Sequence, residues 1–244
     1  MTASLPERLA GMLSQARRAV FFGGAGVSTE SGIPDFRSTD GLYHQQWRYP
    51  PETILSHTFF QRRTEEFFDF YRKKMLFPQA RPNAAHLALA ELEKRGILAA
   101  VITQNIDGLH QAAGSQRVIE LHGSVLRNHC VRCGRSFSME EILASDGVPR
   151  CGCGGVIKPD VVLYEEALPT DAIEDALDAI AAADLLIIGG TSLSVYPAAG
   201  FVESYAGPLV IINRSPTSMD RKADLLIDAP IGQTLAEVMR IMGE

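Results

Sequence analysis

Six short, almost uninterrupted runs of apolar residues constrain the fold of this chain more than any other feature of its sequence. Several are rich in β-branched residues, and they cover residues 18–23, 97–103, 118–121, 184–189, 208–213 and 224–228. Continuous rather than alternating apolarity is typical of strands that are covered on both faces, as in a parallel sheet. We therefore expect a parallel sheet buried between two layers of helices.

Helical patterns lie between several of these runs. Residues 83–95 begin at Asn83, a good capping residue, and stop before Gly96, with apolar side chains along one face. Residues 171–182 carry another apolar stripe and follow Thr170, which we expect to cap the helix. Helices that alternate with buried strands predict an α/β fold with a Rossmann-like, doubly wound parallel sheet.

Two segments interrupt the predicted sheet and are expected to form a smaller inserted lobe. Residues 38–96 show no convincing strand but a helical run of aromatic residues, and residues 124–159 hold all four cysteines. The Rossmann-type domain would then consist of residues 1–37, 97–123 and 160–244. The small domain would consist of the helical insertion and the cysteine-containing module.

Charge and hydropathy exclude several classes of protein. The chain has 23 basic and 29 acidic residues, and this net charge of −6 disfavours a specific nucleic-acid binder or a membrane-surface binder. No run approaches the roughly 20 apolar residues of a membrane span, and charges interrupt the apolar positions near the N-terminus. We expect a cytoplasmic protein, in which thiols stay reduced and cysteines hold metal more often than they form disulfides.

The four cysteines form two closely spaced pairs, Cys130 with Cys133 and Cys151 with Cys153. Thiolates from two turns can reach the tetrahedron that zinc prefers, with Zn–S distances of about 2.3 Å. Four thiolates leave no open position on the ion, so this zinc site would be structural. The alternatives are two free or redox-active pairs, and a site in which His129 replaces one cysteine.

A glycine-rich turn, GGAGVSTESG, follows the first apolar run. Gly24 and Gly26 let the backbone turn sharply and approach a ligand, and the amides of a following helix would favour a phosphate. The dehydrogenase pattern is incomplete, because Thr29 stands in the place of the third glycine and no strand ending in an acidic residue follows about 20 residues later. The turn favours nucleotide binding and disfavours hydride transfer.

Two further segments carry side chains suited to ligand binding. In GIPDFR, Phe36 can cover a planar ring and Arg37 can hold a phosphate or a carboxylate. TQNIDGLH follows the second apolar run, at a strand end, where parallel sheets bind ligands. Its polar side chains would be costly to bury without partners. The next run ends in ELHG, where His122 is a metal ligand, a packed core residue or a general base.

In this order, the motifs resemble those of sirtuins, which are NAD-dependent protein-lysine deacylases. The resemblance covers nearly the whole chain and is closest to compact prokaryotic members; it rests on GAGVS, GIPDFR, TQNID, His122-Gly123, the cysteine pairs, GTSLSVYPA and the strand end at Asn213. It implies that NAD lies between the Rossmann-type domain and the zinc-containing lobe. An acyl-lysine peptide would enter from the opposite side of the cleft.

The resemblance also implies residue roles. Asn105 and His122 would be catalytic, and Val161 and Val162 would pair with the backbone of the substrate peptide. The residues in contact with NAD would be Ala25, Gly26, Thr29, Phe36, Arg37, Gln104, Asn105, Ile106, Asp107, His122, Thr191, Ser192, Asn213 and Ile231. One structural zinc ion would be held by Cys130, Cys133, Cys151 and Cys153.

The implied reaction removes acetyl or other uncharged acyl groups from protein lysines. The acyl oxygen attacks the ribose carbon that carries nicotinamide, and His122 then deprotonates a ribose hydroxyl, because neutral imidazole is available near neutral pH. Water completes the reaction, and the products are nicotinamide, O-acyl-ADP-ribose and free lysine. The partners would be acetylated proteins or peptides, and we expect a monomer. The alternatives are a protein mono-ADP-ribosyltransferase and a non-catalytic NAD-sensing module.

Two departures from family patterns bear on the substrate. Sirtuins that prefer succinyl or malonyl groups carry a Tyr-x-x-Arg pair, whose places are taken here by Phe68 and Tyr71. Arg72 would point about 100° away around a helix, so we expect acetyl or longer uncharged chains. Where many relatives read Phe-Phe-Gly-Glu, this chain reads Leu-Tyr-Glu-Glu at residues 163–166. We expect altered flexibility of this loop and a solvated pair of carboxylates, Glu165 and Glu166.

Overall fold

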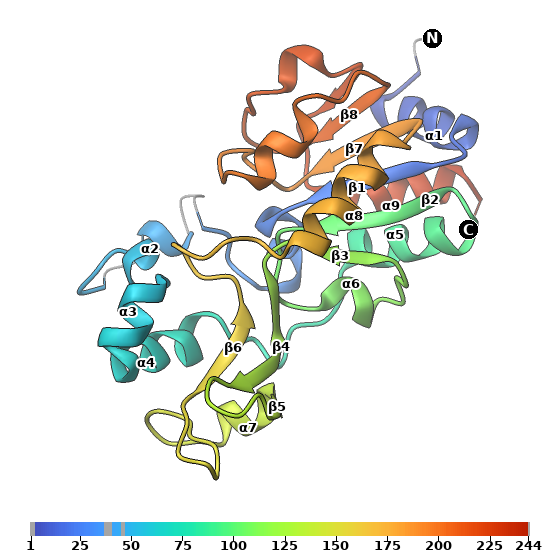
Figure 1. Cartoon of the computed structure of the whole chain (residues 1–244). Helices are drawn as coiled ribbons and strands as arrows, with labels where there is room; N and C mark the ends of the chain where they lie inside the picture. The colour runs from blue at the N-terminus through green and yellow to red at the C-terminus, as the bar shows by residue number, and fades with distance from the viewer. Residues whose placement is uncertain (1–2, 37–40, 45–46, 244) are drawn as a thin grey trace.

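A parallel six-stranded sheet forms the centre of the larger lobe (Figure 1). This computed structural model describes residues 3–36, 41–44 and 47–243. The strand order is β3-β2-β1-β7-β8-β9, and all neighbouring strands are parallel. The strands are β1 (Ala19–Gly23), β2 (Leu98–Thr103), β3 (Val118–Glu120), β7 (Leu185–Gly189), β8 (Leu209–Ile212) and β9 (Leu225–Ile227). Each lies within one of the six apolar runs, so the predicted parallel sheet is confirmed.

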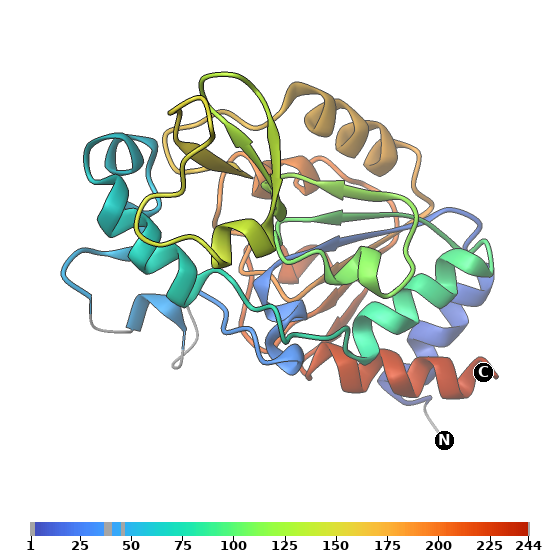
Figure 2. The ribbon, with the colours of Figure 1, turned by 90° about the horizontal axis from the view of Figure 1, so that it is seen from below.

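Helices cover both faces of this sheet, as two perpendicular views show (Figures 1 and 2). One face carries α1 (Leu5–Gln15), α5 (Ala84–Lys94) and α9 (Ile231–Ile241), and the other carries α8 (Thr170–Ala181) and η4 (Ala198–Val202). Phe21 and Phe22, neighbours in β1, are both fully buried but belong to cores on opposite faces. Successive side chains of a strand point to opposite faces, so the continuous apolar run reflects burial on both sides.

The helix boundaries follow the capping signals in one case and not in the other. Asn83 precedes α5, and its side chain accepts a hydrogen bond from the amide of Ala85 at 2.9 Å. The prediction that Thr170 caps α8 is wrong. Pro169 precedes the helix with φ −59° and ψ 130°, and Thr170 is already the first helical residue. The fixed φ of proline suits this position, so the helix begins one residue earlier than predicted.

Helix α5 lies within the segment predicted to form the helical insertion, yet it packs on the large sheet. Its residues Ala85, Leu89 and Leu92 share a buried core with α9 and the strands. The helices that pack in the small lobe are α2 (Pro51–Ile54), α3 (His57–Arg62) and α4 (Thr64–Lys74). The predicted aromatic helix is therefore two helices, which are separated by the non-helical backbone of Arg63.

The cysteine-containing module is built on a three-stranded antiparallel sheet. Its strands are β4 (Gly123–Cys130), β5 (Ser136–Ser138) and β6 (Ile157–Val161), and the short helix α7 (Met139–Leu143) follows β5. A shared core joins this module to the helices of the small lobe, with Phe67, Tyr71, Val125, Ile142 and Leu163 among its buried side chains. The remaining short elements are η1 (Ala25–Val27), η2 (Thr29–Ser31), η3 (Leu42–His44), α6 (Leu109–Ala112) and η5 (Asp220–Lys222). In the described part of the chain, every helix is too short or too polar to cross a bilayer.

Candidate active site and metal site

The strand order places a crevice at the centre of the large sheet. β1 and β7 are neighbours, and the chain continues from them toward opposite edges of the sheet. In open α/β sheets, ligands bind at such a switch point, beyond the carboxyl ends of the strands. A cavity of about 1200 Å³ lies there. This volume exceeds the roughly 300–1000 Å³ of a typical small-molecule pocket, so the cavity has room for more than one small ligand.

The cavity brings together residues that are widely separated in the sequence. Arg37 lies outside the described residues. The other residues predicted to bind NAD or the peptide line the cavity: Ala25, Gly26, Thr29, Phe36, Gln104, Asn105, Ile106, Asp107, His122, Val161, Val162, Thr191, Ser192, Asn213 and Ile231.

The glycine turn after β1 packs against a second turn after β7. The amide of Gly26 donates a hydrogen bond to the carbonyl of Gly190 at 2.8 Å, and a Cβ on Gly26 would lie 2.8 Å from the Gly190 Cα. Gly190 itself has a φ of +59°, and a Cβ there would lie 2.4 Å from the Val27 nitrogen. These two glycines therefore allow the turns to touch.

The predicted helix after the glycine turn is absent from the described chain. Two short 3-10 turns, η1 and η2, follow β1, and Gly32 ends the second in a left-handed conformation with φ +81°. Because the Gly26 amide is already bonded to Gly190, it cannot also point at a ligand. The expectation of a regular helix N-terminus at this place was wrong.

Ser28, which the sequence analysis did not select, lies at the centre of the polar part of the cavity. Its side chain is almost fully buried, and its hydroxyl donates to Asp107 Oδ2 at 2.6 Å and accepts from Asn105 Nδ2 at 3.0 Å. Asp107 Oδ1 also accepts from the Leu109 amide. Burial raises the pKa of Asp107, although these hydrogen bonds oppose the shift. The only sequence signal for Ser28 was its place in the glycine turn, since a single serine has no distinctive spacing.

His122 lies between β3 and β4, and its imidazole is oriented by a backbone carbonyl. Its Nδ1 is 2.9 Å from the carbonyl oxygen of Gln104. A carbonyl only accepts hydrogen bonds, so Nδ1 carries the proton and Nε2 keeps its lone pair. Burial lowers the pKa of His122, and the hydrogen bond to Gln104 partly opposes this shift. A neutral imidazole with a free Nε2 can act as a general base at neutral pH.

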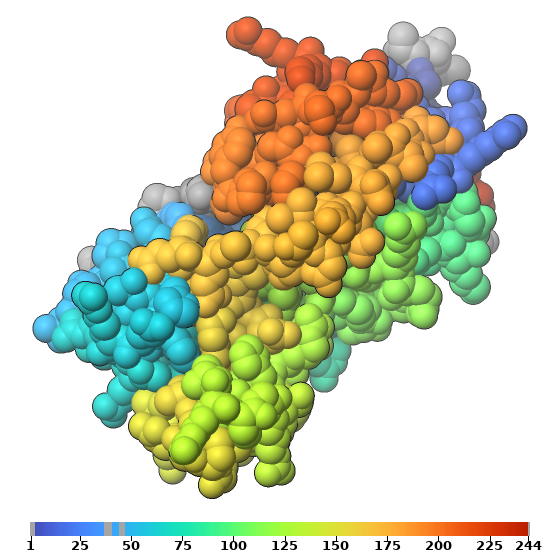
Figure 3. All heavy atoms as spheres, viewed as in Figure 1, coloured from blue at the N-terminus to red at the C-terminus, as the bar shows by residue number. Residues whose placement is uncertain are grey.

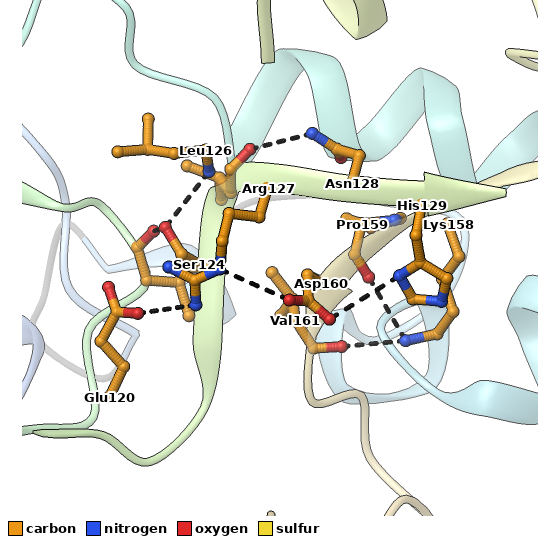
Figure 4. A network of polar contacts seen from close by, with 12 residues as sticks. Glu120, Ser124, Leu126, Arg127, Asn128, His129, Lys158, Pro159, Asp160 and Val161 are labelled. Carbon is orange, nitrogen blue, oxygen red and sulfur yellow. Dashed lines mark hydrogen bonds and ion pairs between the residues drawn. The ribbon is translucent and has the colours of Figure 1, made fainter. Parts of the chain in front are cut away.

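The segment after β6 is held beside His122. The amide of Val162 donates to the carbonyl of His122 at 3.0 Å. Lys158 Nζ donates to the carbonyl of Val161 at 3.0 Å (Figure 4). In the same view, Arg127 bridges Glu120 and Asp160, at 2.7 and 3.4 Å. These contacts connect β3 of the large sheet to the antiparallel strands β4 and β6 of the small lobe.

The four cysteines form a cluster suited to one metal ion. Their sulfur atoms all lie within 4.8 Å of one another. The Sγ atoms of Cys130 and Cys153 are 3.5 Å apart, and those of Cys133 and Cys151 are 3.7 Å apart. Two thiolates bound to one tetrahedral zinc ion lie about 3.8 Å apart, whereas a disulfide needs about 2.05 Å. The cysteines therefore fit a zinc ion. His129 stands outside this cluster, with Nδ1 3.7 Å from Asp160.

The helical part of the small lobe forms one wall of the cavity. Tyr71 and Lys74 on α4 line it, while Phe68 is buried in the core. Arg72 points elsewhere, as predicted: its guanidinium donates to the Ile142 carbonyl at 3.1 Å and to Ser145 Oγ at 2.8 Å. No sequence motif marks Lys74 as a residue of the site; its Nζ lies 5.7 Å from the centre of the Trp47 ring.

The fold and the site define a class of protein: an α/β protein with a large crevice at the sheet switch point, faced by a lobe with a four-cysteine metal site. The chain belongs to the Sir2 family, whose model matches residues 24–197.

Relatives with similar sequences cover almost the full length of the chain. A protein of Clostridium perfringens is 56% identical over 96% of this chain and 98% of its own length, and one of Clostridium acetobutylicum is 55% identical over 93% and 95%. Both are named NAD-dependent protein deacetylase.

Solved structures agree with this assignment. A Sir2–p53 peptide–NAD+ complex is 41% identical, covers 96% of this chain and 97% of its own, and has a TM-score of 0.86. Sir2 bound to acetylated peptide is 39% identical, covers 99% of this chain and 100% of its own, and also has a TM-score of 0.86.

Proposed function

We propose that this Sir2-family protein is an NAD-dependent protein deacetylase in which His122 is the general base. The observation that carries this proposal is the oriented, neutral imidazole inside a cavity large enough for two substrates. Relatives of matching length that are more than half identical are named NAD-dependent protein deacetylases, which supports the reaction class.

The first group of cavity residues acts at the nicotinamide end of NAD and at the substrate peptide. NAD supplies a ribose carbon from which nicotinamide departs when the acyl oxygen of the substrate attacks. His122 Nε2 accepts a proton from a ribose hydroxyl, while the Gln104 carbonyl holds the ring in the required tautomer. Ser28 connects Asn105 with Asp107, so these side chains face the nicotinamide end in fixed orientations. Val161 and Val162 pair with the peptide backbone next to His122.

The other predicted NAD contacts serve the rest of the dinucleotide. Ala25, Gly26 and Thr29 line the phosphates and ribose, and Phe36 lies at the nicotinamide ribose. Thr191, Ser192, Asn213 and Ile231 hold the adenosine half, on the β7 and β8 side of the switch point. Ribose recognition by these loops replaces the acidic residue of dehydrogenases.

The metal site has a structural role. Cys130, Cys133, Cys151 and Cys153 hold one zinc ion, which stabilises the β4–β6 module and takes no part in the chemistry. His122 and the cysteines are connected through β4, which begins at Gly123 and ends at Cys130. Zinc thereby stabilises the strand that leads away from the base.

The substrates are acetylated proteins, and the acyl group is acetyl or a longer uncharged chain. The cation needed for an acidic acyl group is absent at the places of Phe68 and Tyr71, and Arg72 is bound to α7 and the residues after it. Lys74 lies one helical turn beyond Tyr71, with its Nζ near Trp47. We place the protein in the cytoplasm and expect a monomer. Faster turnover of a succinylated peptide than of its acetylated twin would refute this acyl preference.

The proposal is tested by incubating the protein with an acetyl-lysine peptide, with and without NAD. Mass spectrometry should detect free lysine peptide, nicotinamide and O-acetyl-ADP-ribose only when NAD is present. The His122→Tyr variant should lose this activity, and His129→Gln, at a partly exposed histidine of the small lobe that does not line the cavity, is the matched control. NAD-independent turnover or an active His122→Tyr variant would reject the mechanism. ADP-ribosylated protein as the main product would favour the transferase alternative.

A further inference from the structure

The backbone at Glu165 adopts a conformation that normally belongs to glycine. Its φ is +76°, and among the described residues only Glu165 and Leu193 combine a side chain with a positive φ. This left-handed conformation brings Cβ close to backbone atoms, so a residue other than glycine adopts it only when other contacts compensate. The contacts of the Glu165 side chain supply such compensation.

The Glu165 carboxylate binds the start of α3 in the small lobe. Its Oε2 accepts a hydrogen bond from the Thr58 amide at 2.8 Å, and this bond lowers the pKa of Glu165. The first amides of a helix have no partner within the helix, so they are available to side chains. Ser56 accepts from the next amide, that of Phe59, at 3.2 Å. Glu165 stays exposed to solvent, as predicted, although its carboxylate is hydrogen-bonded to α3. Glu166 departs from the prediction, because its side chain is only 21% exposed and is paired with His57 and Lys158.

Tyr164 and Glu166 also attach this loop to the start of α3. Tyr164 forms a parallel bridge with Ser56: its amide donates to the Leu55 carbonyl at 3.0 Å, and its carbonyl accepts from the His57 amide at 2.9 Å. Glu166 contacts His57 Nδ1 at 2.7 Å and Lys158 Nζ at 3.1 Å. One edge of the loop is thus occupied by the linker between α2 and α3.

The segment of residues 161–166 is attached to α3 through its C-terminal residues and to the candidate active site through its N-terminal residues. Val162 is hydrogen-bonded to the backbone of His122, and residues 161–166 all line the cavity. In Figure 3 the yellow segment that follows β6 lies between the cyan helical module and the green strands. Movement of residues 163–166 away from α3 would therefore displace Val161 and Val162 relative to His122.

We propose that Glu165 is a positioning residue for the substrate peptide. Its carboxylate holds residues 163–166 on α3, and this keeps the peptide-pairing backbone at Val161 and Val162 at the correct place beside His122. The inference rests on the proposed function, because the acetylated peptide is the ligand that this segment would bind. NAD contacts on the β7 and β8 side of the cavity are independent of this attachment.

The test is steady-state kinetics of three variants with an acetyl-lysine peptide and NAD. Glu165→Ala keeps the unfavourable backbone conformation and loses the hydrogen bond to the Thr58 amide, so the peptide KM should rise severalfold. Glu165→Gly should raise it less, because glycine adopts this φ freely. Glu165→Gln retains an acceptor for the Thr58 amide, so its peptide KM should stay within about twofold of the unchanged protein. The NAD KM should not change in any variant.

The exposed Glu174 on α8 provides a matched control, and Glu174→Ala should behave like the unchanged protein. The inference is overturned if Glu165→Ala leaves the peptide KM unchanged, if Glu165→Gln is as impaired as Glu165→Ala, or if the NAD KM rises in parallel. Glu165→Gly carries no backbone penalty, so it keeps the test valid if Glu165→Ala folds poorly. If the protein without substitutions shows no NAD-dependent deacetylation, the proposed function is refuted instead.

Discussion

A pair of buried histidines, His86 and His110, predicts that this protein loses stability in mild acid. Their side chains are almost fully buried, and their ring centres are 4.7 Å apart. His86 Nδ1 accepts a hydrogen bond from the Asn83 amide at 3.2 Å, which requires a neutral ring. In the described structure, His86 Nε2 and both ring nitrogens of His110 have no hydrogen-bond partner. A proton on either ring would therefore be a buried charge without an acidic partner.

The size of the effect follows from the pKa values. Burial lowers the pKa of His86 to about 4, and burial together with the charge of His86 lowers that of His110 to about 3. In the unfolded chain both have a pKa of about 6.5. Below pH 6.5 the unfolded state therefore binds protons that the folded state does not, so the free energy of unfolding falls as the pH falls. At pH 5 each histidine should lower it by about 2 kcal/mol, or about 4 kcal/mol together.

Urea denaturation followed by circular dichroism at pH 7.5 and pH 5.0 measures this change. Acid also affects carboxylates and thiolates, so the informative quantity is the difference between variants. The double variant His86→Gln with His110→Gln should lose about 4 kcal/mol of the pH dependence, and His110→Gln alone about half of it. His129→Gln, at a partly exposed position beside Asp160, should not remove this loss of stability in acid. A double variant with the same pH dependence as the unchanged protein would refute the reasoning.

Three further predictions concern the site. Burial lowers the pKa of His122 below its ordinary value of about 6.5, and the base must be neutral, so the acidic limb of the pH profile of kcat/KM should have its midpoint below pH 6.5. A midpoint above pH 7 would contradict this assignment. Cys133→Ser should release zinc, which metal analysis measures, and should lower the melting temperature, which calorimetry measures. The control Ser14→Ala on α1 should change neither the zinc content nor the melting temperature. Gly190→Ala should destabilise the protein by about 2 kcal/mol or more, because the new Cβ would clash with the Val27 nitrogen and the φ of residue 190 is left-handed. The control is Gly11→Ala, where the added Cβ has no neighbour within 4 Å. Equal melting temperatures for the two variants would contradict this prediction.

Local sequence patterns were sufficient for several features. The apolar runs identified all six strands of the large sheet, because burial on both faces requires continuous apolarity. The cysteine spacing identified the metal site, because two thiolates on one tight turn can bind the same ion. The place of His122 at a strand end, within a recognisable set of motifs, was sufficient to make it the candidate base.

Other features depend on contacts between residues far apart in the chain. The capping signal at Asn83 located the start of α5, but only the shared core with α9 places that helix on the large sheet. The Gly26 amide is bonded to Gly190, which no pattern around residue 26 reveals. Ser28 became notable only because Asn105 and Asp107 lie beside its hydroxyl.

The sequence by itself determined the fold class, the family, the candidate zinc ligands and the candidate base, since each of these depends on residue type and short-range spacing. Only the tertiary structure decided the tautomer of His122, the neutrality of the His86–His110 pair and the attachment of Glu165 to α3. Hydrogen-bond partners and burial are set by segments that meet through folding, and it is these that determine the pKa of a buried group and the conformation of a loop.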